Sequence, residues 1–354
     1  MRFGDWLRLI ASGRFAVTVN CLPRIVGTTL ITPVNSFLGL LSDAIHGRRA
    51  EAVTVTPPIF ILGHWRTGTT LLHELFAEDP AMATPTVFQC LFPNAFLIAP
   101  GIAPLLNLFL SPTRVFDNVP MSYDRPQEDE FAVLNCGMGT PYRSLAFPRH
   151  GLNDLHYLDL AEATSVERQA WEAAYLTLIK RFQLVHGKRL VLKSPLHTGR
   201  IATLARLFPG ARFIHLARNP FEVFPSSVNT FHVMGSWQGL HNPGPSEDTI
   251  KEWVLDVFER LFAAYERDRP SVAPGHLAEV RYEDLTADPE GTLRGIYETL
   301  GLDGFEAALP RMRTFLAVRS SYRRNSFVLG DDDRVTIRAR WRRYFERFGY
   351  STIG

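Results

Sequence analysis

The chain has 354 residues, of which 46% are hydrophobic and 21% are charged, so the composition excludes a disordered protein and predicts a full core. A net charge of +2 is too small to indicate a nucleic-acid-binding protein, although it is compatible with a few arginines that bind an anionic ligand locally. Three cysteines without metal-ligand spacing argue against a disulfide framework and favour a reducing compartment, so we expect a cytoplasmic protein.

The N-terminal segment, residues 1–56, is predicted to begin with a basic amphipathic helix. The apolar and basic positions of this helix are Trp6, Leu7, Leu9, Ile10, Arg2, Arg8 and Arg14. Two interpretations are open: the helix packs on the main domain, or it binds an anionic membrane surface as a peripheral contact. The next stretch, residues 16–31, is fairly apolar, but Pro23 and Arg24 argue against a membrane-spanning helix.

A strand, a glycine loop and a helix are predicted from Ile59 onward. Four apolar residues form the buried strand, Gly63 and Gly68 bracket a short loop, and a helix opens at Thr69. Glycines let the backbone fold around an oxyanion, and the first N–H groups of the helix point at it. The spacing is that of a P-loop, but Thr69 replaces the lysine and the nearest cation is Arg66, inside the loop.

An insertion on one side of a binding site is predicted for about residues 80–150, which carry many prolines. Its most apolar part, residues 96–110, is too short and too broken by Pro and Gly to span a bilayer. This part is a buried insertion, the wall of a hydrophobic acceptor pocket or a patch that touches lipid. Further along, Glu128, Asp129 and Glu130 precede an apolar run at an expected helix start, where acids complement the helix dipole or take part in chemistry.

Helices and strands alternate through the rest of the chain. A capping box at Thr164 and Glu167 begins a long helix to about Val185, whose apolar face is expected to be Val166, Ala170, Ala174, Leu178 and Phe182. Strands are expected at 189–193, 213–217 and 277–282, and helices at 197–208, from 221, and at 250–267, 289–300 and 335–348. This order predicts an α/β fold with a doubly wound, mainly parallel sheet and a ligand site at the carboxyl ends of the strands.

A second motif follows the strand at residues 213–217. Arg218 stands at the strand end, Pro220 suits a first helical turn, and Ser226 comes eight residues after Arg218, with Ser227 beside it. A guanidinium fork together with a neutral donor is what a bound phosphate dianion requires.

The two motifs together resemble those of sulfotransferases that use 3′-phosphoadenosine 5′-phosphosulfate (PAPS), chiefly the bacterial sulfotransferase-like families and more distantly the tyrosylprotein sulfotransferases. The resemblance implies that residues 57–354 form a sulfotransferase domain that uses PAPS as co-substrate and no metal. It also implies a 5′-phosphosulfate loop and a 3′-phosphate site. The loop residues would be Gly63, Arg66, Thr67, Gly68, Thr69 and Thr70. The 3′-phosphate residues would be Arg218 and Ser226, with Arg323 and Arg324 in a basic loop near the C-terminus.

The resemblance also implies two catalytic cations and a base. Arg66 and Lys193, at the end of a buried strand, would lie near the sulfuryl group. In classical cytosolic sulfotransferases a histidine follows the strand lysine by two positions, whereas here it comes at His197. Tyrosylprotein sulfotransferases use a glutamate about twenty residues after the loop, where this chain has Gln89. His197 is therefore the first candidate for the base, Glu128 the second and Glu130 the third.

Two other histidines are expected to have lesser roles. His64 lies in the glycine loop and is expected to touch the acceptor, whereas His73 lies along a helix and is expected to be a core residue.

The predicted function is sulfuryl transfer from PAPS to a hydroxyl of a small acceptor, hydrophobic, lipid-like or glycosyl, by in-line displacement. One alternative is a P-loop nucleotide kinase or phosphotransferase, which would need the missing lysine and an aspartate for Mg²⁺. Another is a membrane-associated nucleotide-binding protein that has lost catalysis, to which Gln89 and the displaced His197 point.

Overall fold

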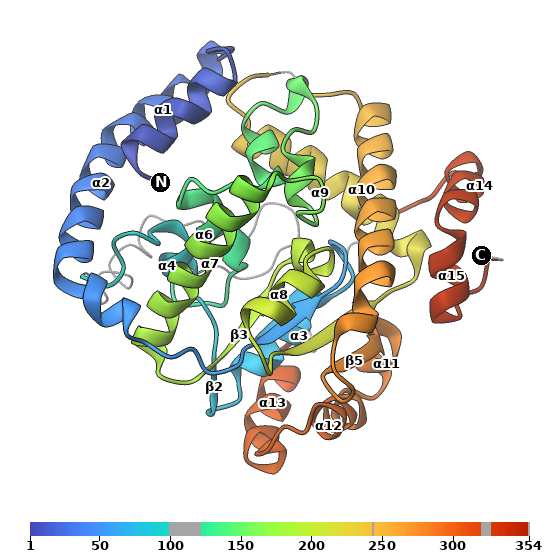
Figure 1. The fold of residues 1–354 in the computed structure, drawn as a ribbon. Coiled ribbons are helices and arrows are strands. Elements are labelled where there is room, and N and C mark those ends of the chain that lie inside the picture. The colour runs from blue at the N-terminus through green and yellow to red at the C-terminus, as the bar shows by residue number, and fades with distance from the viewer. Residues whose placement is uncertain (99–121, 243, 320–326, 353–354) are drawn as a thin grey trace. The chain divides into compact units, whose positions relative to one another are not determined.

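The computed structural model describes residues 1–98, 122–242, 244–319 and 327–352 (Figure 1). These residues divide into two compact units. The first, here called the helical unit, comprises Met1–Val55, Pro85–Gly187 and Thr230–Ile250. The second, here called the sheet unit, comprises Thr56–Thr84, Lys188–Asn229 and Lys251–Gly354. Residues from Pro85 to Gly187 thus group with the N-terminal segment.

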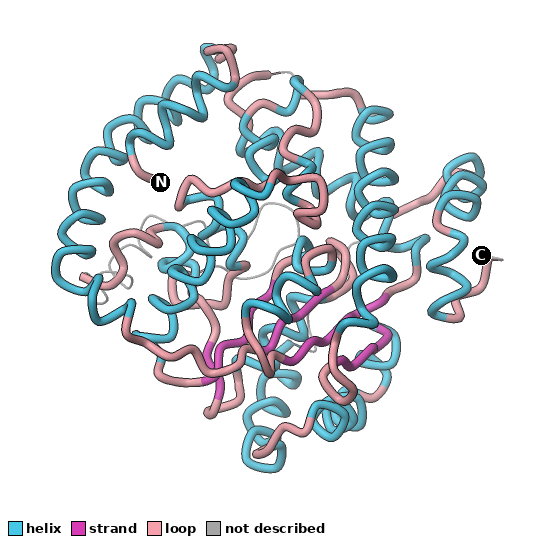
Figure 2. The backbone as a smooth tube through the Cα atoms, viewed as in Figure 1, coloured by secondary structure: helices cyan, strands magenta, loops and turns pink. Residues whose placement is uncertain are grey.

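The sheet unit contains five parallel strands in the order β2-β3-β1-β4-β5 (Figure 2, magenta). Their bounds are β1 Ile59–Leu62, β2 Met82–Ala83, β3 Arg189–Lys193, β4 Arg212–Ala217 and β5 Leu277–Arg281. All four residues of β1 are fully buried, as expected for a strand covered on both faces. The predicted parallel α/β sheet is confirmed.

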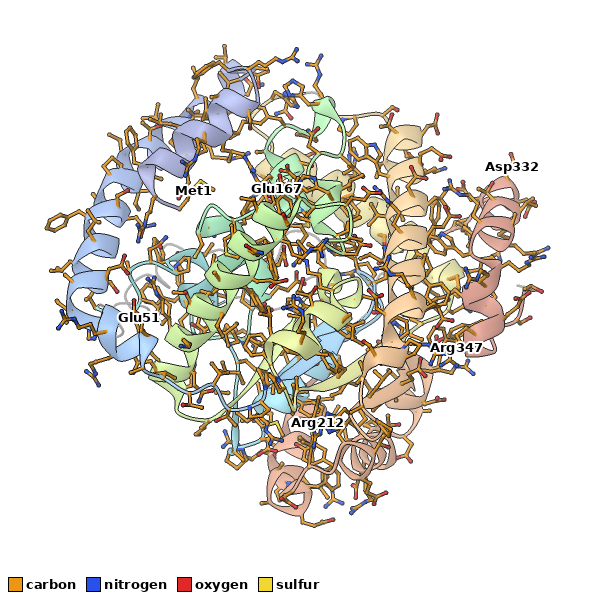
Figure 3. The ribbon with its side chains drawn as sticks, in the orientation of Figure 1. Met1, Glu51, Glu167, Arg212, Asp332 and Arg347 are labelled. Atoms are coloured by element: carbon orange, nitrogen blue, oxygen red, sulfur yellow. The ribbon has the colours of Figure 1, made fainter. Side chains whose placement is uncertain are left out.

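Helices lie between and after these strands along the chain. They are α3 Thr69–Ala77, α8 Ile201–Leu207, α9 Pro220–Gln238, α10 Glu247–Asp268, α11 Tyr282–Ala287, α12 Pro289–Leu300, α13 Phe305–Arg319, α14 Asp331–Arg340 and α15 Arg342–Phe348. Residues of β1, β3, β4 and β5 share one apolar core with α3, α12 and α13. Partly exposed ion pairs also occur in this unit. One of them joins Arg347, labelled in Figure 3, to Glu279 of β5.

Two predicted helices of the sheet unit were wrong in their bounds. The helix expected at 197–208 begins only at Ile201, because Pro195–Thr198 form a separate 3-10 turn. The helix expected at 335–348 is two helices, which meet at Trp341, whose φ of −99° and ψ of 17° lie outside the helical range. Trp341 is almost fully buried and stacks on Phe258, so its packing decides where the chain turns.

The helical unit contains α1 Phe3–Ser12, α2 Leu22–Glu51, α4 Val87–Leu91, α6 Asp129–Asn135 and α7 Ser165–His186, with short 3-10 turns between them. The capping box at the start of α7 is present, as predicted. The predicted buried face of α7 was partly wrong, since Val166 is 74% exposed. Trp171 and Tyr175, which stack at 4.8 Å, are buried instead, because large aromatic rings fill the core better than alanine and valine.

The apolar face of α1 is part of the core of the helical unit. Trp6, Leu9 and Ile10 are buried in a cluster with Phe147 and Leu240. The first interpretation of this helix, packing within the protein, is therefore confirmed. The stretch at 16–31 continues into α2, and the helical region Val19–Glu51 is the one candidate among the described residues that is long and apolar enough to cross a membrane.

Candidate functional site

The loop between β1 and α3 requires its two glycines. Gly63 has φ +135° and Gly68 has φ +96°, both in the region that disfavours other residues. A Cβ atom on Gly63 would lie 2.6 Å from the carbonyl oxygen of Leu216, and one on Gly68 would lie 2.2 Å from the ring of Tyr282. The backbone is thus packed as closely as an anion-binding loop needs, with the N-terminus of α3 directly behind it.

This packing makes a stability prediction. We expect Gly63→Ala to lower the free energy of unfolding by roughly 1–3 kcal/mol, because the new Cβ meets backbone and φ is strained. The matched control is Gly295→Ala in α12, which has nothing within 4 Å and should stabilise by about 0.5–1 kcal/mol. Urea unfolding of both variants measures the difference. Equal effects at the two positions would contradict the assigned loop conformation.

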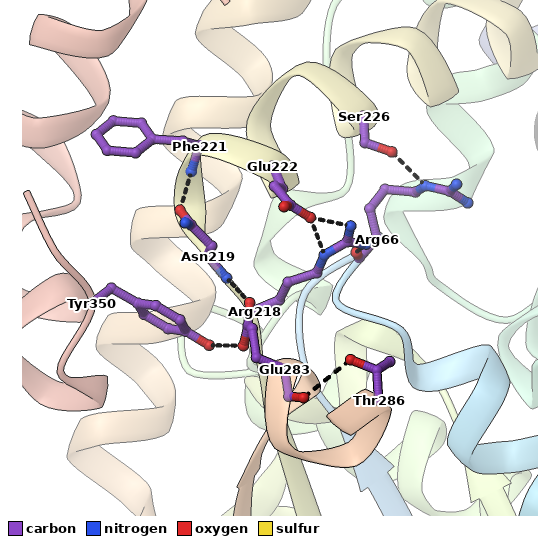
Figure 4. A network of polar contacts seen from close by, with 9 residues as sticks. All are labelled: Arg66, Arg218, Asn219, Phe221, Glu222, Ser226, Glu283, Thr286 and Tyr350. Atoms are coloured by element: carbon purple, nitrogen blue, oxygen red, sulfur yellow. Dashed lines mark hydrogen bonds and ion pairs between the residues drawn. The ribbon is translucent and has the colours of Figure 1, made fainter. Parts of the chain in front are cut away.

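Arg66 joins the loop to the second motif. Its φ is +69°, a left-handed conformation that is uncommon for arginine. The Nε–H group donates to Ser226 Oγ at 2.9 Å, and the Arg66 carbonyl oxygen accepts from Arg218 Nη1 at 2.9 Å (Figure 4). The structure therefore brings Arg66, Arg218 and Ser226 together although 152 and 160 residues separate Arg66 from the other two.

Arg218 is held from several sides. Its guanidinium forms an ion pair with Glu222, one turn later in α9, and lies 4.5 Å from the centroid of the Tyr282 ring. Its backbone N–H donates to the hydroxyl of Tyr344 at 3.1 Å. Tyr282 thus lies against both Arg218 and the Gly68 position of the loop. Glu222 and Tyr282 are two residues that the sequence analysis missed.

Glu283 fixes the start of α9 (Figure 4). Its Oε1 accepts from the Asn219 N–H at 3.0 Å, and its Oε2 accepts from the Tyr350 hydroxyl at 2.8 Å. The Asn219 side chain in turn caps Phe221 N–H at 3.0 Å. Burial raises the pKa of Tyr350, so its hydroxyl stays a donor. This network holds the turn that carries Arg218.

Lys193 lies at the carboxyl end of β3 with only 2% of its surface exposed. It stands opposite Ile61 of β1, two residues before the glycine loop. The turn after β3 is tied to that loop, because Thr198 Oγ1 accepts from the Gly63 N–H at 2.8 Å. Thr198 was not predicted from the sequence, because no motif around it indicates a contact with the glycine loop. Lys193 therefore belongs to the same strand edge as Arg66.

His197 and His73 are both buried. His197 is fully buried in the 3-10 turn, with its ring edge-on to Phe60 at 5.3 Å. His73 is buried in α3, 3.2 Å from the Val191 carbonyl oxygen, so the prediction that it is a core residue is confirmed.

His64 lies inside the glycine loop in an aromatic environment. Its ring contacts Trp65, Phe258 and Trp341, and Nδ1 lies 3.0 Å from the Trp65 carbonyl oxygen. Burial lowers the pKa of His64 to about 3, so the imidazole is neutral near pH 7. It is thus enclosed by aromatic rings, and its contact with an acceptor stays a prediction.

The acidic run lies in the helical unit, at the start of α6. Glu128 is the N-cap residue and its Oε2 accepts from the Tyr142 hydroxyl at 2.8 Å. Asp129 and Glu130 are fully buried, and Asp129 Oδ2 accepts from the Tyr175 hydroxyl at 2.7 Å. Glu128 and Asp129 therefore each accept a hydrogen bond from a tyrosine hydroxyl within the helical unit.

Gln89 has a structural role in α4. Its Oε1 accepts from the Thr86 N–H at 3.0 Å in a capping box and lies 3.1 Å from His186 Nε2. Arg323 and Arg324 lie outside the described residues. Within the residues that are described, no group of three or more His, Cys, Asp and Glu side chains is placed to hold a metal ion.

Comparison with known protein sequences gives a family model and a named relative. The model of the "Sulfotransferase family" matches residues 57–307, well over half of the chain. A protein named omega-hydroxy-beta-dihydromenaquinone-9 sulfotransferase Stf3, from Mycobacterium bovis and from Mycobacterium tuberculosis, is 38% identical over 349 residues, which cover 98% of this chain and 89% of that protein.

Two solved structures share the fold. The sulfotransferase STF9 from Mycobacterium avium has a TM-score of 0.74 at 19% identity, covering 95% of this chain and 88% of that one. The sulfotransferase STF1 from Mycobacterium tuberculosis has a TM-score of 0.65 at 19% identity, covering 96% and 91%.

Proposed function

The chain belongs to the sulfotransferase family, and from that premise we propose that it transfers a sulfuryl group from PAPS to the terminal hydroxyl of a lipid-like acceptor. Family membership makes the chain a sulfotransferase, and the donor, the acceptor and the residue roles are our proposal. The observation that carries it is the convergence of Arg66, Arg218 and Ser226 beside a glycine loop at the carboxyl ends of β1 and β4.

The residues of the sheet unit fit a donor with two anionic groups. The loop from Gly63 to Gly68 leaves room for backbone N–H donors but not for a Cβ atom, which suits a phosphosulfate. Arg218 supplies a guanidinium fork and Ser226 a hydroxyl, the pair that suits a separate phosphate. When bound, PAPS supplies the sulfuryl group and leaves as adenosine 3′,5′-bisphosphate.

Cations and a base account for the chemistry that the chain itself provides. Arg66 and Lys193 stabilise the negative charge that grows on the leaving phosphate oxygen. The loop and the helix α3 hold the reacting groups in line. A base accepts the proton of the acceptor hydroxyl as the new sulfur–oxygen bond forms, and His197 and Glu128 are the candidates.

The proposed acceptor rests on the relative that is 38% identical. Its name specifies a menaquinone, a lipid quinone, that carries an omega-hydroxyl group, which is a hydroxyl at the end of a chain. The same hydroxyl chemistry is what the sequence predicts for a hydrophobic acceptor. We therefore propose a long-chain lipid alcohol of this kind for the present chain.

Titration calorimetry with adenosine 3′,5′-bisphosphate in EDTA tests the donor site. We expect metal-independent binding that weakens by about 2–5 kcal/mol in Arg218→Ala, because a buried charge-paired contact is lost. Arg311→Ala, an exposed arginine of α13, is the matched control and should leave affinity unchanged. Glu222→Gln should tighten binding, because it removes the carboxylate that competes for Arg218.

Transfer is then measured by the mass gain of an omega-hydroxylated menaquinone incubated with PAPS and the protein. Bisphosphate binding without transfer to any lipid alcohol would favour the inactive nucleotide-binding protein. Binding only of Mg²⁺–ATP would favour a phosphotransferase and would contradict the donor proposed here.

A further inference from the structure

Helix α2 has its polar side turned toward its own protein. Polar side chains recur along one face of the helix and bond to α1 and α7 within the helical unit. These contacts join Thr29 to Trp6 Nε1 at 2.9 Å, Asn35 to the Met1 carbonyl oxygen at 2.9 Å, Ser36 to the Phe3 N–H at 2.7 Å, and Asp43 to Arg2 at 2.7 Å and Arg181 at 2.5 Å. In a water-soluble helix that packs on a core, the inward face is the apolar one.

The opposite side of α2 is apolar and exposed. Leu30 is 71% exposed, Phe37 66% and Leu40 63%. They belong to a row of exposed residues with helical spacing, which we call the α2 stripe: Val26, Leu30, Ile31, Pro33, Val34, Phe37, Leu40, Leu41, Ala44 and Ile45. The helix has 30 residues, so the stripe runs along an element about 45 Å long. Contiguous exposed apolar surface of this extent marks an interaction site.

Arginines border the α2 stripe at both ends. Arg24 is exposed before it, although its Nη1 donates to the Gly239 carbonyl oxygen at 2.6 Å, and Arg48 and Arg49 are exposed after it. None of the exposed positions from Leu22 to Arg49 is acidic. An apolar face with cations beside it and no acid on it is complementary to a lipid surface with anionic headgroups.

We propose that the α2 stripe docks the protein on an anionic lipid bilayer, with α2 lying in the plane of the interface. The helix does not span, because its polar side is engaged by α1 and α7 and could not face hydrocarbon. Docking would give the protein access to a lipid alcohol held in the bilayer, and this part of the inference rests on the proposed function. The docking surface is α2, whereas the apolar face of α1 is already buried in the protein.

A second copy of the chain fits the α2 stripe less well. A symmetric pair of such helices would bring Arg24 against Arg24 if they ran parallel, and against Arg48 and Arg49 if they ran antiparallel. In both arrangements cations would meet cations, and no exposed acid between Leu22 and Arg49 would neutralise them. Lipid phosphates neutralise the same arginines directly.

Vesicle flotation tests the proposal with the full chain and with neither donor nor acceptor present, so its outcome is independent of the proposed function. We expect the protein to float with vesicles of equal phosphatidylglycerol and phosphatidylcholine. The variant Leu30→Glu/Phe37→Glu/Leu40→Glu should partition at least tenfold less. Val166→Glu, which charges an exposed valine of α7 in the same unit, should partition like the wild type.

A second variant keeps the apolar row intact. Arg48→Gln/Arg49→Gln should lower partitioning into anionic vesicles by roughly fivefold for each arginine and change partitioning into pure phosphatidylcholine little. A wild-type protein that floats with neither vesicle would overturn the proposal. So would a wild-type dimer in light scattering that the triple variant turns into a monomer, because the occupant of the stripe would then be a second copy.

Discussion

Lys193→Met is expected to lower kcat by roughly 10²- to 10³-fold, because the substitution removes a cation from the strand end beside the glycine loop. Methionine has a similar length and suits the buried position, where 2% of the lysine is exposed. The bisphosphate affinity of the variant should change much less than kcat, because the cation acts mainly on charge that develops during transfer. Initial rates at saturating donor, with calorimetry of the bisphosphate, separate the two effects.

The matched control for this variant is Lys188→Met. Lys188 directly precedes β3 and is exposed, so kcat should stay near the wild-type value. A Lys193→Met protein that unfolds at the same temperature as the wild type and keeps kcat within threefold would remove Lys193 from the proposed chemistry.

The second large effect on kcat is expected for the general base that accepts the proton of the acceptor hydroxyl. We expect Glu128→Gln to lower kcat by about 10²- to 10⁴-fold, the usual contribution of a general base. We expect His197→Gln to lower the melting temperature while leaving kcat within tenfold. The reason is that the His197 ring is fully buried against Phe60, inside an aromatic cluster with Phe208 and Phe213.

The position of that aromatic cluster supports the structural role of His197. Ile59 and Ile61 belong to the core formed with α3, and side chains alternate along a strand, so Phe60 faces the other side of the sheet. His197 therefore packs in the core on that second side. A bell-shaped pH profile of kcat/KM that loses its acidic limb in His197→Gln, with full activity of Glu128→Gln, would reverse the two assignments.

The strands β1, β3, β4 and β5 could be predicted because their signals are local, whereas β2, α11 and α13 were not predicted. The apolar run before Gly63, the run before Arg218 and the Pro at the start of α12 each lie within a few residues of what they specify. The candidate site residues Arg66, Arg218 and Ser226 were predicted for the same reason, since spacing within each motif is a local property. Their mutual contacts were expected only through the resemblance.

Other features depend on residues that are distant in sequence. Tyr282 directly follows the carboxyl end of β5 and contacts both the glycine loop and Arg218. No sequence pattern around Tyr282 indicates these contacts. The full length of α2 was not predicted, and Pro23 and Arg24 argued only against a membrane-spanning helix. In the structure Pro23 occupies the first turn, where its missing N–H costs nothing, and the helix continues through Pro33 on the exposed side.

The ion pair between Arg218 and Glu222 has a consequence for turnover. An arginine that already has a carboxylate partner takes up a phosphate by exchange, so the nucleotide is held less tightly than an unpaired arginine would hold it. Under the proposed function, the product adenosine 3′,5′-bisphosphate carries the same 3′-phosphate as the donor and must leave before the next cycle. The Glu222 carboxylate competes with the 3′-phosphate for Arg218. This competition shortens the residence time of the spent nucleotide, so a lower affinity for the nucleotide allows faster turnover.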